Sequence, residues 1–237
     1  MNKINLFCLP YAGGSRSAYY QYAKMSPGHL NIVPLELPGR GARFNEPPLT
    51  DVYAMVDDVF KQISNQLDRP YAIYGHSMGA ILGYLLARRI DAERLNPPLH
   101  LFFTGCGGPS MLKKEKKLSE MERAALMKEL REMGGMPDEI LNNDHHLEIF
   151  LPILLADLKA TETFEYVQSE KLNIPVSVIT GSEEGISAEK VEAWKKETVA
   201  TVDIQKLPGN HFFIFEYGSA IIELIMNALF PVINKQN

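Results

Sequence analysis

The stretch RPYAIYGHSMGAILGYLLARRI, residues 69–90, predicts a strand that turns directly into a helix. Tyr71 to Tyr74 are four residues of which three are aromatic or β-branched, and a proline and a glycine bound them, which is typical of a strand. Apolar residues then recur at helical spacing up to Ile90, and two arginines occupy the last turn, where cations suit the helix dipole. No loop separates the two elements, so the turn must be very tight.

The turn itself, Gly75-His76-Ser77-Met78-Gly79, has the G-x-S-x-G pattern of a nucleophile elbow. In an elbow the serine takes a strained backbone conformation, so that its hydroxyl stands clear of the sheet. The two glycines fit, because a side chain at either position would meet the neighbouring strand or helix. The pentapeptide alone also occurs in unrelated proteins. Between a strand and a helix it favours a nucleophilic serine over a glycine-rich turn with an idle one.

Short apolar runs alternate with helical patterns along the chain. This order predicts an α/β fold with a mostly parallel central sheet that is flanked by helices. A chain of 237 residues with 46% hydrophobic residues can bury a large core, so we expect a single domain over residues 1–237. The predicted strands are residues 4–10, 31–38, 71–75, 99–105, 175–181 and 202–208.

The interval from residue 106 to residue 173 shows helical patterns and no strand candidate. One pattern, SEMERAALMKELREMGG, opens with a capping box of Ser119 and Glu122. Its apolar face carries Leu126, Leu130 and Met133. An all-helical insertion between sheet strands is expected to form a lid over the active site, with the glycine pair at 134–135 as its hinge.

If Ser77 is a nucleophile it needs a base, and His211 is the best-placed histidine. In the α/β-hydrolase order the serine comes first, the acid second and the histidine last. His211 follows the last predicted strand, on a Gly-Asn turn before an apolar helix. The other histidines lie too early in the chain, inside the insertion or inside the elbow: His29, His100, His145, His146 and His76.

The acid should follow the strand at 175–181, where GSEEG offers Glu183 and Glu184 but no aspartate. A glutamate can accept the Nδ1 hydrogen of the histidine and hold its tautomer. Each of the two could equally be a solvated loop carboxylate, and the residues alone leave that open.

The oxyanion hole requires two backbone amides near the serine. The amide of Met78, directly after the nucleophile, is one candidate. The loop LPYAGGSRSAY, residues 9–19, supplies the second, because Gly13 and Gly14 let its backbone turn toward the serine. The alternative is an ordinary strand-to-helix loop.

Composition argues against several other classes of protein. A formal net charge of −5 gives no general attraction to nucleic acid or to an anionic membrane, so we expect neither as a partner. Cys8 and Cys106 make no disulfide framework and lack the neighbours of a metal site, so both are expected to be buried apolar residues. The apolar run near the N-terminus is too short for a signal peptide, so we expect a cytoplasmic protein. We also expect it to be a monomer.

In their order and spacing these motifs resemble a type II thioesterase, the stand-alone editing enzyme of nonribosomal peptide and polyketide synthesis. The likeness covers nearly the whole chain. The motifs that carry it are CLPYAGGS near the N-terminus, PLELPGRGAR at 34–43, YGHSMGA at 74–80, GGMP at 134–137, LPILLADLKATETFEY at 151–166, EAWKKET at 192–198 and PGNHFF at 208–213.

The resemblance implies an α/β-hydrolase fold and a defined set of site residues. It places the acid three residues after the glycine that ends its strand, which is Glu184. The family usually has aspartate there, and it commonly has an arginine before Asp157 where this chain has Leu155. The implied catalytic triad is Ser77, Glu184 and His211, with the amides of Ala12 and Met78 as the oxyanion hole.

The resemblance also implies the substrate: an acyl group held as a thioester on the phosphopantetheine arm of an acyl or peptidyl carrier protein. Hydrolysis would proceed through an acyl-serine and would need no metal or diffusible cofactor. The lysine-rich run KKEKK at 113–117 is a candidate docking surface for an acidic carrier protein. Two alternatives stay open, a carboxylesterase acting on small free esters and a catalytically weak protein that only binds carriers.

Overall fold

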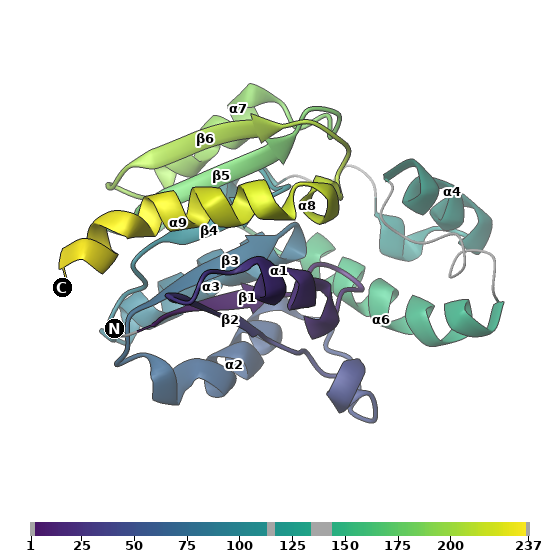
Figure 1. The fold of residues 1–237 in the computed structure, drawn as a ribbon. Helices are drawn as coiled ribbons and strands as arrows, with labels where there is room; N and C mark the ends of the chain where they lie inside the picture. Colours follow the sequence, from purple (N-terminus) through teal and green to yellow (C-terminus); the bar gives the residue numbers. More distant parts are fainter. Residues whose placement is uncertain (1–2, 113–116, 134–143, 236–237) are drawn as a thin grey trace.

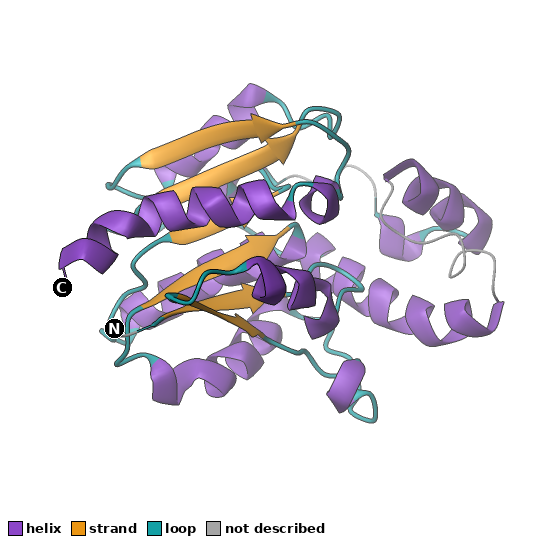
Figure 2. Ribbon diagram, in the orientation of Figure 1, coloured by secondary structure: helices purple, strands orange, loops and turns teal. Residues whose placement is uncertain are grey.

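The computed structural model describes residues 3–112, 117–133 and 144–235. Its centre is a six-stranded sheet in the order β2-β1-β3-β4-β5-β6, in which every neighbouring pair is parallel. All strands point toward the same edge (Figure 2). The sequence-based prediction of an α/β fold with a parallel sheet is therefore confirmed. The strands are β1 (Ile4–Leu9), β2 (Leu30–Pro34), β3 (Tyr71–His76), β4 (Leu101–Thr104), β5 (Val176–Gly181) and β6 (Val202–Leu207).

Both faces of the sheet are buried, which explains why the strands read as nearly continuous apolar runs. In β1, Phe7 and Leu9 belong to one core cluster, whereas Leu6 and Cys8 belong to the other. Helices α2 (Val52–Ile63) and α3 (Met78–Ala92) cover the first face. Helices α1 (Tyr20–Met25) and α9 (Gly218–Lys235) cover the second, the near face in Figure 1.

Among the described residues of the insertion, the α-helices α4 (Arg123–Met133) and α6 (Asp144–Glu162) lie beyond the carboxyl edge of the sheet on the right of Figure 1. They pack through an apolar cluster that includes the predicted Leu126 and Leu130. The glycine pair predicted as the hinge lies outside the described residues, and the lid itself stays a prediction. The remaining α-helices of the described residues are α7 (Ala188–Glu192) and α8 (Phe213–Glu216). None of the helices formed by the described residues has the length and apolarity needed to cross a bilayer.

The capping box predicted at Ser119 and Glu122 is wrong. Ser119 lies in a short 3-10 helix, Leu118–Glu120, and α4 begins only at Arg123. The hydroxyl and the amide of Ser119 both donate to the carboxylate of Glu162 at the end of α6, and that carboxylate also accepts from the amide of Leu118 at 2.8 Å. A charged acceptor supplied by a distant helix has replaced the local cap.

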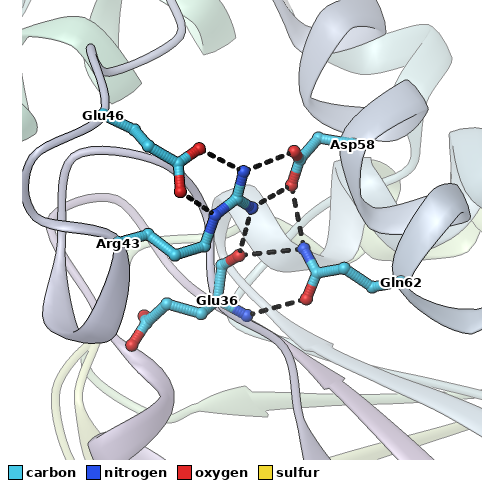
Figure 3. Close-up of polar contacts among 5 residues, drawn as sticks. All are labelled: Glu36, Arg43, Glu46, Asp58 and Gln62. Atoms are coloured by element: carbon cyan, nitrogen blue, oxygen red, sulfur yellow. Dashed lines mark hydrogen bonds and ion pairs between the residues drawn. The ribbon is translucent and has the colours of Figure 1, made fainter.

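A polar network fixes the loop between β2 and α2 (Figure 3). Arg43 donates to the carboxylates of Glu46 and Asp58, each from two nitrogens, and to the backbone carbonyl of Glu36. Gln62 of α2 donates to that same carbonyl at 2.9 Å and to Asp58 at 2.8 Å. The guanidinium thus ties the loop to α2 at several points, so the preceding residues of the loop have a defined position.

Strand β3 passes into α3 through a single residue. Ser77 has φ 54° and ψ −116°, a strained conformation for a residue with a side chain. A Cβ on Gly75 would lie 2.1 Å from the carbonyl oxygen of Gly79, and a Cβ on Gly79 would lie 2.6 Å from that of Leu9 in β1. These overlaps confirm the steric reason for both glycines.

We predict that Gly75→Ala lowers the free energy of unfolding by about 3 kcal/mol or more, because its methyl group would overlap backbone that cannot move aside. Gly28→Ala is the matched control, since a Cβ there meets nothing within 4 Å. It should leave stability unchanged or slightly raised. Urea denaturation followed by circular dichroism measures both, and equal loss in the two variants would contradict the steric explanation.

Candidate active site

The predicted site residues come together at the carboxyl edge of the sheet. Ala12 follows β1, Ser77 follows β3, Glu184 follows β5 and His211 follows β6. The carboxyl ends of parallel strands meet at one edge, which is where open α/β sheets bind ligands. All four residues, together with Met78, line one cavity of about 780 Å³.

The carboxylate of Glu184 bonds to the imidazole of His211. Nδ1 of His211 lies 2.6 Å from Oε1 of Glu184, whose side chain is 1% exposed. The other carboxylate oxygen accepts from the amide of Gly181, which orients the carboxyl group. Glu183 is exposed one residue earlier. Since a carboxylate can only accept, Nδ1 carries the hydrogen and the neutral ring keeps Nε2 as its basic nitrogen.

Ser77 is held by its backbone and borders the same cavity. Its amide donates to the carbonyl of Thr104 at the end of β4, at 2.9 Å, and its carbonyl accepts from Ala80 at 3.0 Å. Within the described residues the Ser77 hydroxyl makes no hydrogen bond, so Ser77 and His211 share the cavity without bonding directly. Catalytic hydrogen bonds are often long before substrate binds.

Two backbone amides adjoin the serine. Met78 is the first residue of α3, where the helix dipole favours negative charge. Ala12 precedes Gly13, which has φ +75°, in the loop after β1. In the part of the chain that the structure describes, neither the Ala12 nor the Met78 amide has a hydrogen-bond acceptor. Both are available to a developing oxyanion, and this role stays a prediction.

His76, which sequence reasoning only excluded as a base, lies against the ring of His211. The ring centroids are 4.7 Å apart, and Nδ1 of His76 lies 3.0 Å from Oγ1 of Thr104. Burial lowers the pKa of His76 well below its ordinary value, and the nearby His211 lowers it further. A neutral ring therefore packs on the candidate base.

A buried ion pair beside the site was missed from the sequence. Arg40 and Asp157 are 3% and 0% exposed, and their nitrogen and oxygen atoms approach to 2.6 Å. Burial raises the pKa of Asp157, and the bonds from Arg40 oppose that shift. Leu155, two residues before Asp157, packs against the α4–α6 cluster. The two partners are 117 residues apart, so no local pattern could have paired them.

The part of the cavity wall that α4 and α6 supply is mostly apolar, although Thr161 and Glu162 at the end of α6 also line the cavity. Leu130 comes from α4, and Phe150, Leu154 and Leu158 come from α6. Such a wall suits a hydrocarbon chain rather than a charged ligand.

Cys8 and Cys106 are both buried, as predicted, and burial raises the pKa of the Cys8 thiol. Among residues 3–112, 117–133 and 144–235, no group of three or more His, Cys, Asp or Glu side chains is arranged to hold a metal ion.

Comparison with known proteins gives likenesses over nearly the whole chain. Residues 4–229 match the family described as thioesterase domain. The gramicidin S biosynthesis protein GrsT of Aneurinibacillus migulanus is 32% identical over 228 residues, which are 96% of this chain and 89% of that protein. The RedJ thioesterase of the prodiginine pathway in Streptomyces coelicolor is 30% identical, with a TM-score of 0.89 over 95% of this chain and 85% of that one. The type II thioesterase BorB of the borrelidin biosynthetic cluster is 28% identical, with a TM-score of 0.88 over 96% and 93%.

We predict that His76 stays neutral throughout the range of about pH 5 to 8 in which histidines ordinarily titrate. An NMR titration of labelled histidine measures this, with the His76 signal identified by its loss in His76→Gln. Below about pH 6.5 the unfolded chain takes up a proton at this residue and the folded chain does not. The free energy of unfolding should therefore decrease as the pH is lowered below this value. His100, whose pKa burial lowers to about 4, acts in the same direction. A His76 signal that titrates within this range would contradict the effect of burial.

Proposed function

The chain belongs to the family of thioesterase domains, and on this premise we propose that it removes acyl groups from the phosphopantetheine arm of carrier proteins in nonribosomal peptide or polyketide synthesis. It is a hydrolase that acts on thioesters, and the resemblance to type II thioesterases inferred from its motifs is confirmed. The pathways named for its relatives support an editing role, in which stray short acyl groups are cleared from a blocked synthetase. One observation carries the proposal for the site: the Glu184–His211 pair, Ser77 and an apolar wall share one cavity.

The first step would form an acyl-serine. Oγ of Ser77 attacks the thioester carbonyl while Nε2 of His211 takes its proton, and Glu184 stabilises the resulting imidazolium. The amides of Ala12 and Met78 bind the oxyanion of the tetrahedral intermediate. The carbon–sulfur bond then breaks, and the pantetheine thiol leaves with the proton that His211 returns.

The second step would release the acid. Water attacks the acyl-serine as His211 takes one of its protons, and the proton returns to Oγ of Ser77 as the ester bond breaks. The products are a free carboxylic acid and an unblocked carrier protein. This route calls for no metal or diffusible cofactor, because the phosphopantetheine belongs to the substrate.

How the carrier protein docks stays a prediction. In the lysine-rich run, Lys113, Lys114 and Lys116 lie outside the described residues. Lys117 is exposed and pairs with Glu120 at 2.8 Å, so part of its charge is already compensated. The monomeric state and the cytoplasmic location are likewise predictions.

The insertion at 106–173 is proposed to act as a lid. Its helices α4 and α6 supply the apolar wall of the cavity, and α4 lies outside the two helical layers that cover the sheet. An acyl chain enclosed by this wall would be shielded from water until the lid opens.

We predict that the amides of α4 exchange with deuterium faster than those of β3. Strand β3 lies inside the sheet with helices on both faces, so its amides should open only with global unfolding. Hydrogen exchange followed by mass spectrometry compares the two segments. Equal protection of α4 and β3 would count against a lid that opens.

We predict that Ser77→Ala abolishes hydrolysis of an acetyl-carrier protein, by at least about 10³-fold in kcat, while the fold is retained. The substitution removes one hydroxyl from a turn that its backbone holds. Residual activity near that of the wild type would rule out the acyl-serine. Comparing acyl-pantetheine thioesters with the matching oxygen esters separates the thioesterase from a carboxylesterase, and no turnover at all would favour a protein that only binds carriers.

Glu184→Gln should lower kcat by about 10²- to 10⁴-fold, because an amide can stabilise the wrong tautomer of His211. Glu183→Gln is the matched control, since Glu183 is exposed and the bond to His211 comes from Glu184. It should leave kcat nearly unchanged. The reverse ranking of the two variants would assign the acid to Glu183.

A further inference from the structure

We propose that the buried pair of Arg40 and Asp157 is a positioning device that holds the oxyanion loop, residues 12–14, in the conformation that catalysis requires. The inference rests on the proposed function and extends it to two residues outside the triad. Neither side chain lines the cavity, so neither is expected to touch the substrate.

The pair makes hydrogen bonds to the backbone of the loop. Oδ2 of Asp157 accepts from the amide of Gly13 at 2.7 Å and from Nη1 of Arg40 at 2.6 Å. The same Nη1 donates to the carbonyl of Gly14 at 3.0 Å, while Nη2 donates to Oδ1 of Asp157 at 2.7 Å. An N–H and a C=O of adjacent residues are thus both fixed, directly after the candidate oxyanion donor Ala12.

The loop needs such a hold because of its own sequence. Gly13 has φ +75°, and glycine is the residue with the greatest backbone freedom. Within the loop, the amide of Gly14 donates to the carbonyl of Tyr11 at 2.8 Å and closes a turn. A residue with a side chain would be strained at this φ, and its Cβ would lie 2.5 Å from the ring of Phe150, so a stiffer residue in place of Gly13 is not a ready alternative. The turn bond sets the local shape of the loop but not its position relative to the serine, so that restraint has to come from outside the loop.

The chemistry of the pair also favours positioning over stability. Desolvating two charges is unfavourable, and well-packed apolar residues can often replace a buried ion pair without loss of stability. Nε of Arg40 is buried without a partner, so the guanidinium is not placed to satisfy all of its own donors. Apolar residues could fasten α6 to the loop, but they could not bond the amide of Gly13 or the carbonyl of Gly14.

Both charged residues come from elements with a defined position. Arg40 lies three residues before Arg43, whose network fixes the loop after β2 (Figure 3). Asp157 lies in α6, which also forms part of the cavity wall. The pair therefore holds the oxyanion loop in a fixed position relative to two separate elements, the loop after β2 and α6. A shift of either element would displace the amide of Ala12.

An oxyanion donor acts only once negative charge has formed, so its misplacement should lower kcat and leave KM unchanged. The test is the double variant Arg40→Met/Asp157→Leu, which keeps an apolar contact in place of the ion pair. We expect it to fold with a lower stability than the wild type, because the Gly13 amide and the Gly14 carbonyl lose their partners. Its kcat should fall between about 10- and 100-fold and its KM should change little. Arg89→Met, which removes a pair between α3 and α2 far from the loop, is the control and should keep full activity.

A second readout separates positioning from a general loss of structure. An acyl-pantetheine trifluoromethyl ketone forms a tetrahedral adduct with Ser77 and should bind the double variant more weakly, in proportion to the loss of kcat. The corresponding amide, which forms no adduct, should bind as it does to the wild type. A stable double variant with the kcat of the wild type, or equal weakening of both ligands, would overturn the proposal.

If the double variant does not fold, Asp157→Asn gives the answer. Asparagine keeps one acceptor oxygen for Gly13 but loses the charge that Arg40 holds, so kcat should fall about 10-fold at constant KM. The proposal would also be overturned if this variant kept the kcat of the wild type, or if it bound the amide ligand as much more weakly as it binds the ketone. A wild-type protein without thioesterase activity would instead overturn the proposed function.

Discussion

The structure depends on a steric constraint where β3 becomes α3. Strand, turn and helix approach so closely that neither Gly75 nor Gly79 has room for a methyl group, and the carbonyl of Leu9 in β1 closes the remaining space. This contact forces Ser77 into its strained conformation and places its hydroxyl at the cavity, at the edge where the other loops end. Folding of the central strands and positioning of the candidate nucleophile are thus one event. The strain at Ser77 is retained because close packing on three sides determines it.

Around that turn, the electrostatic setting of the candidate base is fixed by residues that do not themselves react. Glu184 selects the tautomer of His211 through Nδ1, and the amide of Gly181 keeps the carboxylate in place. On the other side the ring of His76 is buried and neutral, so His211 gains an uncharged neighbour. An imidazolium formed during catalysis would therefore find its compensating charge at Glu184 alone among these neighbours, which couples protonation of His211 to the acid.

The sequence predicted those parts of the fold and site that have a local signal. Each strand is a short apolar run, the elbow is a pentapeptide in a defined context, and His211 follows its strand directly, so all could be placed from neighbouring residues. Contacts between distant segments could not be predicted. Asp157 and Arg40 are 117 residues apart, and the local cap expected at Ser119 gave way to a carboxylate from the end of α6. In each of these cases a charged group buried or half-buried by tertiary packing decides the bonding, and no periodicity reveals which partner it will meet.

These long-range contacts change how the insertion is to be understood. The sequence suggested one lid over residues 106–173, but the structure fastens α6 to the loop after β1 through Asp157, and to the start of the insertion through Glu162. A movement of α6 would break a buried ion pair and the bond from the Gly13 amide, and on the proposal made above it would also displace the oxyanion loop. Helix α4 packs on α6 through an apolar cluster. If the insertion opens as proposed, an opening that keeps the buried pair intact would have to move α4 while α6 stays in place.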